Sequence, residues 1–136
     1  MDYKAPPDLL KDKIVLVTGA GDGIGKTASL TYAKHGATVI LLGRTVEKLE
    51  KLYDEIIESD LPEPGIVPMD LSTASVEAIQ QMAEVILGKY GRLDGLLHNA
   101  AILGDRVPFE TYDLNQWSMV MQVNFHSPTI LTHGLL

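Results

Sequence analysis

A glycine-rich segment, TGAGDGIG at residues 18–25, directly follows an apolar run and constrains the fold of this chain more than any other feature. The run before it, Ile14 to Val17, is mostly β-branched and is typical of a buried strand. From Ile24 the residues Ile24, Ala28, Thr31 and Tyr32 recur at helical spacing up to Lys34, which predicts one apolar face of a helix, and Gly36 then supplies a stop signal. The glycine-rich segment is therefore predicted to connect a strand to a helix.

Three further segments predict three more strands. Residues 37–42 and 66–69 are nearly continuous apolar runs, and residues 94–98 form a shorter segment around two leucines. Continuous rather than alternating apolar character favours parallel strands that are covered on both faces.

A helical pattern follows each of these strands, and the last three begin at a candidate capping residue. Thr45 precedes one helix, Ser72 or Ser75 the next, and Asp113 the last. Asp113 and Gln116 form a D-x-x-Q arrangement, which predicts a capping box in which Gln116 reaches back. The alternation of strands and helices predicts an α/β fold, an open doubly wound sheet with right-handed crossovers.

Composition excludes several classes of function. A hydrophobic fraction of 46% with 21% charged residues predicts one packed domain rather than a disordered chain. The net charge of −7 disfavours nucleic acid and anionic membranes as partners. The chain has no cysteine, and its histidines share no metal-binding spacing, so no disulfide and no metal site are expected. No run approaches the roughly 18 apolar residues of a membrane span, and no signal peptide is evident, which predicts a cytoplasmic protein.

The glycine-rich loop is suited to bind an anion such as a pyrophosphate. Unpaired backbone N–H groups and the helix dipole favour negative charge there, and the glycines allow positive φ and close approach. The sequence does not match G-x-G-x-x-G; its pattern is T-G-x-x-x-G-x-G. The candidate cofactor-binding residues of the loop are Thr18, Gly19, Gly21, Asp22, Gly23, Ile24 and Gly25.

The same segment also supports a second interpretation. Residues 20–27, AGDGIGKT, differ by one residue from the P-loop pattern G-x-x-x-x-G-K-[ST] of nucleotide phosphotransferases. In that case Lys26 would bind phosphates and Thr27 a magnesium ion, with Asp70 or Asp94 as a second metal partner. In a dinucleotide-binding protein Lys26 and Thr27 are ordinary residues of the first helical turn. The loop alone leaves both interpretations open.

The end of the second strand favours a dinucleotide, and NADP(H) over NAD(H). An enzyme that prefers NAD needs an acidic residue there for the ribose 2′-hydroxyl, whereas this chain has Leu42-Gly43-Arg44. The guanidinium of Arg44 is suited to pair with a 2′-phosphate. A solvated arginine at a helix start is the alternative.

Four motifs then occur in a fixed order: TGAGDGIG at 18–25, LDG at 93–95, HNAA at 98–101 and MQVN at 121–124. With these, the chain resembles the short-chain dehydrogenase/reductase family over nearly its whole length, and it is most similar to a group of bacterial oxidoreductases within it. The resemblance implies a Rossmann-like sheet of which four strands are present and the C-terminal strands are missing. Residues 1–136 would then be the NADP-binding N-terminal part of one domain.

The resemblance places the rest of the cofactor site after the third and fourth strands, at Asp70, Leu71, Asn99, Ala100 and Ala101. It identifies Asn124 as the active-site asparagine, which binds a relay water for the catalytic lysine. Pro128 gives this assignment independent support, because its missing N–H frees the Asn124 carbonyl and predicts a bend there. A proline-kinked packing helix is the alternative.

Members of the family transfer a proton through a Tyr-x-x-x-Lys pair and orient the substrate with a serine. None of the five tyrosines of this chain has a lysine four residues later. We therefore predict that the chain alone is inactive and that it is a fragment of a longer enzyme. The resemblance implies a small carbonyl or alcohol substrate and a homo-oligomer formed through the Asn124 helix. A dinucleotide-binding module without catalysis is the alternative.

Overall fold

The computed structural model describes residues 2–136, which form two compact units. The sheet unit comprises the chain up to Met69 together with Arg92–Asn99. The helical unit comprises Asp70–Gly91 and Ala100–Leu136. Within residues 2–136 no helix is both long enough and apolar enough to cross a bilayer.

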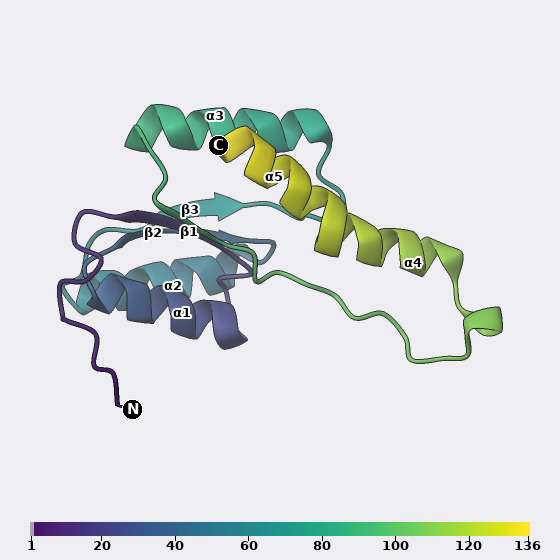
Figure 1. The fold of residues 1–136 in the computed structure, drawn as a ribbon, viewed down its shortest axis with the longest axis horizontal. Helices are drawn as coiled ribbons and strands as arrows, with labels where there is room; N and C mark the ends of the chain where they lie inside the picture. The colour runs from purple at the N-terminus through teal and green to yellow at the C-terminus, as the bar shows by residue number, and fades with distance from the viewer. Residues whose placement is uncertain (1) are drawn as a thin grey trace. The chain divides into compact units, whose positions relative to one another are not determined.

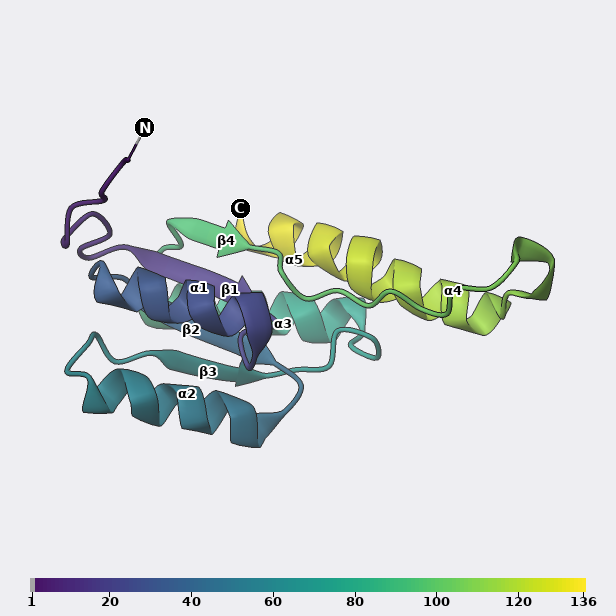
Figure 2. The ribbon, with the colours of Figure 1, turned by 90° about the horizontal axis from the view of Figure 1, so that it is seen from below.

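The sheet unit contains four parallel strands, as the sequence predicts. They are β1 (Ile14–Thr18), β2 (Thr38–Gly43), β3 (Gly65–Pro68) and β4 (Gly95–Leu97), in the order β3-β2-β1-β4. Figure 2 shows this order across the sheet. The α/β class and the parallel sheet are thus confirmed, and the strand ends differ from the predicted ones by at most one residue.

Two helices lie on one face of this sheet, α1 (Gly23–Lys34) and α2 (Val46–Glu58) (Figure 1). Their apolar side chains pack with those of β1 and β2 in one core, which includes Val15, Val17, Ala33, Val39, Leu41, Leu49, Leu52 and Ile56. These strand residues alternate and so share one face, but Leu16, Ile40 and Leu42 of the opposite face are buried too. Both faces of the central strands are therefore apolar, which explains their unbroken apolar runs.

The buried face of α1 differs from the predicted stripe. Ile24 is 78% exposed, whereas the buried residues of the helix are Gly25, Ser29 and Ala33. These three residues are small and spaced four apart, so that they share one face along which the helix approaches the sheet closely. Apolar spacing predicted the helix correctly and its buried face wrongly, because close packing here selects small residues rather than large ones.

The start of β4 is tied to the start of β1 by Asp94. The backbone N–H of Asp94 donates to the Ile14 carbonyl at 2.8 Å, and the Ile14 N–H donates to Asp94 Oδ2 at 2.8 Å. Arg92 Nε donates to the same carboxylate oxygen at 3.0 Å. The bond from the Ile14 N–H, followed by that from Arg92, holds the pKa of Asp94 below its ordinary value. Asp94 thus fixes the amino ends of two neighbouring strands.

The helical unit is built around α3 (Val76–Tyr90) and α5 (Ser127–Leu135), which pack against each other. A Cβ atom at Gly134 would lie 3.0 Å from the Ala83 Cβ, so the two helices meet closely at that point. Of the two predicted caps of α3, Ser75 is the one observed: its side-chain oxygen accepts from the Ala78 N–H at 3.1 Å. The left-handed Gly91 follows the last turn.

A 3₁₀ turn (Phe109–Thr111) precedes α4 (Leu114–Met121), whose start is capped by Asp113 as predicted. Asp113 Oδ1 accepts from the Asn115 N–H at 2.9 Å. The predicted capping box is wrong in its second half, because Gln116 Oε1 instead accepts from the Asp105 N–H at 2.7 Å. The extended loop before the helix has backbone donors without partners in a sheet, and Gln116 satisfies one of them.

Where the sequence predicts a bend in the last helix, the structure has a π-helical turn at Gln122–His126, between α4 and α5. In this turn the Ser127 N–H bonds to the Gln122 carbonyl, five residues earlier. Pro128 follows at the start of α5, where its missing N–H is best tolerated. The single wide turn therefore separates two α-helical segments around Asn124.

We expect Asp94 to make the stability of the chain sensitive to acid. Its carboxylate has a lowered pKa in the folded state, so its contribution is present above about pH 4 and is lost as the pH falls through the folded-state value. In Asp94→Asn the urea midpoint should be lower than that of the parent at pH 7 and should fall less between pH 5 and pH 3. Glu84→Gln, at an exposed position of α3, is the control. An acid-induced loss as large in Asp94→Asn as in the parent would contradict this expectation.

Candidate functional site

The strand register brings three predicted site segments to one edge of the sheet. Val17 of β1 pairs with Leu97 of β4, and Thr18 pairs with Leu42 of β2. The loop after β1, Arg44 after β2 and Asn99 after β4 therefore all extend from the carboxyl ends of neighbouring parallel strands. In open α/β sheets, ligands bind at this edge.

Asn99 fixes the beginning of the glycine-rich loop. Its Nδ2 donates to the carbonyl oxygens of Thr18 and Gly19, each at 3.2 Å. Its backbone N–H donates to Thr18 Oγ1 at 3.0 Å, and Thr18 is almost wholly buried. Asn99, predicted to line a cofactor, is thus shown to hold the loop in place.

Gly25 occupies a position that no other residue fits. A Cβ atom there would overlap the Gly19 carbonyl oxygen and would lie 2.6 Å from Asn99 Nδ2. Gly19 and Gly23 have positive φ angles of 64° and 54°. Gly19 and Gly23 are therefore required by their backbone conformation, and Gly25 is required by the close approach of neighbouring atoms.

The start of α1 is shaped to receive an anion. Asp22 is the N-cap residue with an extended backbone, and its side chain makes no capping hydrogen bond. The first N–H groups of a helix have no acceptor within the helix, so those of Gly23, Ile24 and Gly25 are donors at the positive end of the helix dipole. The loop thereby provides the backbone arrangement expected of a phosphate site.

A cluster of charges lies beside the loop. Lys48, in the first turn of α2, donates from Nζ to Asp22 Oδ2 at 2.5 Å. This hydrogen bond, the charge of Lys48 and the more distant charge of Arg44 lower the pKa of Asp22, so that the carboxylate is ionised. Sequence reasoning missed Lys48, because 26 residues separate it from Asp22. The one indication in the sequence was Asp22 itself, because a carboxylate in a loop suited to bind anions is expected to have a cation beside it.

The residues of the P-loop interpretation do not assemble. Lys26 Nζ pairs with Glu55 of α2 at 3.4 Å. Asp94, a proposed metal partner, lies at the amino end of β4, whereas the loop follows the carboxyl end of β1. The prediction of a metal role for Asp94 is therefore wrong, because the parallel register places the loop and Asp94 at opposite ends of the strands.

In the helical unit, Asp70 and Leu71 form a tight turn. Asp70 Oδ1 accepts from the Ser72 N–H at 2.9 Å and from Ser72 Oγ at 2.6 Å. The Asp70 carbonyl accepts from the N–H groups of Thr73 and Ala74 at 3.2 and 3.0 Å. The orientation of the Asp70 carboxylate is therefore fixed locally by Ser72.

Asn124 lies in the π-helical turn, and both ends of its side-chain amide bind one residue. Asn124 Nδ2 donates to the Ile102 carbonyl at 2.8 Å, and the Ile102 N–H donates to Asn124 Oδ1 at 2.9 Å. Ile102 directly follows Ala100 and Ala101, which have no regular secondary structure. The side chain of the predicted catalytic residue therefore fixes the segment that follows β4, which sequence reasoning did not foresee.

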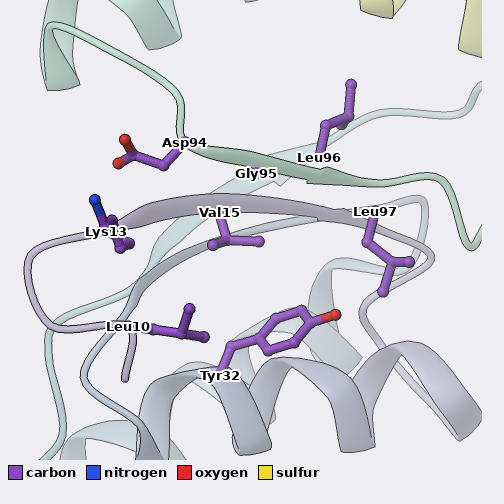
Figure 3. Close-up of a pocket in the computed structure, with 8 residues that line it drawn as sticks. All are labelled: Leu10, Lys13, Val15, Tyr32, Asp94, Gly95, Leu96 and Leu97. Atoms are coloured by element: carbon purple, nitrogen blue, oxygen red, sulfur yellow. The ribbon is translucent and has the colours of Figure 1, made fainter. Parts of the chain in front are cut away.

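A hollow of about 480 Å³ lies elsewhere in the sheet unit. Its apolar wall includes Leu10, Val15, Tyr32 and Leu97, and Figure 3 shows these side chains between α1 and the strands β1 and β4. None of the predicted cofactor-binding residues lines it. The hollow flanks β4, which is an edge strand of the sheet. It therefore belongs to the packing around this edge strand rather than to the glycine-rich loop.

Comparison with protein families gives a match at residues 13–136, to the model described as short chain dehydrogenase. The uncharacterized oxidoreductase YciK of Escherichia coli strain K12 is 48% identical over 136 residues, which are 100% of this chain and 54% of that protein. The chain thus spans about half the length of this relative. The similarity to a group of bacterial oxidoreductases, expected from the sequence, is confirmed.

Two solved structures of relatives contain a cofactor. A short chain dehydrogenase from Shigella flexneri 2a str. 301 complexed with NADP is 48% identical, with a TM-score of 0.92 over 96% of this chain and 55% of the other. A second, from Escherichia coli CFT073 and complexed with NADPH, is 49% identical, with the same TM-score and the same coverage. The fold of this chain is therefore that of about half of each relative.

Replacing Gly25 by alanine should damage the loop. The added Cβ overlaps a backbone oxygen and crowds the Asn99 amide that holds the loop, so Gly25→Ala should destabilise the chain by about 1–3 kcal/mol. Gly88→Ala is the matched control, since a Cβ at that helical position meets nothing within 4 Å. There, alanine should stabilise the chain by up to about 1 kcal/mol. Urea unfolding measures both, and equal stability of the two variants would contradict the packing described.

Proposed function

The chain belongs to the short chain dehydrogenase family, and we propose that it binds NADP(H) for hydride transfer between the cofactor and a small carbonyl or alcohol substrate. The observation that carries the proposal is that relatives 48% and 49% identical to this chain were crystallised with NADP and NADPH. Arg44, rather than an acidic residue, follows β2 in this chain, which supports the same cofactor.

The residues present fit this cofactor. The uncapped N–H groups at the start of α1 are suited to bind the pyrophosphate, and Arg44 to bind the 2′-phosphate. Asp70 would accept a hydrogen bond from the amino group of the adenine, with Leu71 beside the ring. Ala100 and Ala101 would line the cofactor after β4. Asn99, bonded to the carbonyls of Thr18 and Gly19, would hold the phosphate-binding backbone in shape.

For the chemical step, the nicotinamide supplies or accepts a hydride when bound. We propose that the backbone carbonyl of Asn124 holds a water molecule that relays a proton. Its side chain is held by two hydrogen bonds to Ile102, which favours the backbone carbonyl for this role. The Tyr-x-x-x-Lys pair that transfers the proton in the family does not occur among the 136 residues. For these residues alone, a binding module without turnover is the second candidate, favoured by that observation.

The phosphotransferase alternative is left without support. The family model covers the loop and the chain that follows it. In addition, Lys26, which would have to face the phosphates, is directed to Glu55. NADP(H) and Mg-ATP nevertheless remain distinguishable by experiment, because a ligand stabilises only the folded state that binds it.

Thermal unfolding with each ligand tests the proposed cofactor. NADPH should raise the Tm more than NADH does, and Mg-ATP should leave it unchanged. Arg44→Ala should weaken NADPH binding about tenfold or more and remove the preference over NADH, because the 2′-phosphate loses its counter-charge. Arg106→Ala, at an exposed arginine of the helical unit, should keep the preference. Stabilisation by Mg-ATP alone would overturn the proposal.

We also propose that the chain forms a homo-oligomer through the helix that leads to Asn124. Leu114 and Trp117 of α4 are 68% and 49% exposed and lie three residues apart on one helix face, and Phe125 is 58% exposed. Large apolar side chains gathered on an exposed face are typical of a protein interface. A twofold contact would bury this surface against the same surface of a second copy.

A charge on this face should therefore shift the chain towards the monomer. Trp117→Glu is expected to weaken self-association at least tenfold in sedimentation experiments, because it places a carboxylate where apolar surface is buried. Ile57→Glu, which changes a 43% exposed residue of α2, should leave association unchanged. If both variants associate as the parent does, the interface lies elsewhere.

A further inference from the structure

A fully buried hydroxyl connects two parts of the helical unit. Ser127, the first residue of α5, has no exposed surface. Its Oγ donates to the Leu71 carbonyl at 2.8 Å and accepts from Gln122 Nε2 at 3.1 Å. This hydroxyl thus donates one hydrogen bond and accepts another inside the protein, and its position is fixed from both sides.

The partner on one side is the turn that carries Asp70. Leu71 and Ser72 share one planar peptide group, and the two ends of this group are both held. Its oxygen accepts from Ser127, and its N–H donates to Asp70 Oδ1 at 2.9 Å. A rotation of the peptide would break both bonds together. The direction of the Asp70 carboxylate is therefore coupled to the position of the Ser127 hydroxyl.

The partner on the other side spans the π-helical turn. Gln122 and Ser127 stand five residues apart, at the start and directly after the end of that turn. Their side chains bond across it, in addition to the bond between the Ser127 N–H and the Gln122 carbonyl. The π-helical turn thus fixes the position of the Ser127 hydroxyl, and the bond from this hydroxyl to the Leu71 carbonyl in turn fixes the turn at Asp70.

We propose that Ser127 is a positioning residue for adenine recognition: its buried hydroxyl holds the Leu71–Ser72 peptide so that the Asp70 carboxylate faces the exocyclic amino group of the base. This inference rests on the proposed binding of NADP(H). A carboxylate accepts a hydrogen bond from that amino group. Hypoxanthine presents a carbonyl oxygen at the same place, which a carboxylate repels.

The test compares NADPH with its analogue in which hypoxanthine replaces adenine, by titrating each into the 136-residue chain. The parent chain should bind NADPH about tenfold more tightly than the analogue, which is the factor expected of one hydrogen bond to a charged group. In Ser127→Ala this ratio should fall to about one, because the peptide is no longer held and Asp70 turns away. A role in general stability alone would weaken both ligands equally and leave the ratio unchanged.

A matched control is available in the same chain. Ser29 is also fully buried, and its hydroxyl donates at 2.8 Å to a backbone carbonyl, that of Gly25 in its own helix. Ser29→Ala should therefore keep the ratio of the two affinities, whatever it does to their absolute values. Ser127→Cys retains the size of the side chain with a weaker donor and should give an intermediate ratio. It also carries the test if Ser127→Ala does not fold.

The outcomes separate this inference from the function on which it rests. If the parent binds neither ligand, the proposed NADP(H) binding fails and the inference with it. If the parent binds both equally, NADP(H) binding stands and the inference is overturned, since Asp70 does not distinguish the two bases. If Ser127→Ala folds and keeps the parent ratio, the hydroxyl does not position Asp70 and the inference is also overturned.

Discussion

The close approach of Gly25 to the Gly19 carbonyl and to the Asn99 amide is the constraint on which the sheet unit depends. Because Gly25 has no Cβ atom, α1 can begin directly beside the end of β1, and the loop between them is short. The Asn99 amide then bonds to the two carbonyls at the start of that loop. The parallel register of β1 with β4 is what brings Asn99 to this place. The contact of Gly25 with Gly19 and Asn99 therefore connects the end of β1, the segment after β4 and the start of α1.

Much of the fold could be predicted from local patterns, because continuous apolar runs identify the strands and glycines identify the turns. The buried face of α1 could not, since the pattern of large apolar residues placed Ile24 inside. The helix is instead buried along Gly25, Ser29 and Ala33. Hydrophobic periodicity indicates where a helix forms. How closely the helix packs depends on the neighbouring strands, and the spacing of residues along the sequence carries no information about that distance.

The candidate site shows a similar division. Its backbone parts were evident from the glycines and from the residues that follow each strand, because such positions are fixed by connectivity. Its side-chain partners were not: Lys48 pairs with Asp22, and Gln116 with the backbone of Asp105 rather than with its own helix start. These bonds link segments whose distance in space depends on the folded chain, so a rule based on short spacing misses the first and assigns the second to the wrong neighbour.

Two amide side chains hold the segment between β4 and α4 in the helical unit. Asn124 bonds both backbone groups of Ile102, and Gln116 bonds the N–H of Asp105. A segment without regular structure needs such partners, because its backbone groups have none in a sheet or helix. With its amide bonded to Ile102 in this way, the backbone carbonyl of Asn124 is the group that we propose as the proton relay. The π-helical turn and Pro128 act on that same backbone, by changing which N–H groups reach its carbonyl oxygens. The irregular turn thus separates two tasks of one residue: the side chain organises the segment after β4, and the carbonyl serves the proposed chemistry.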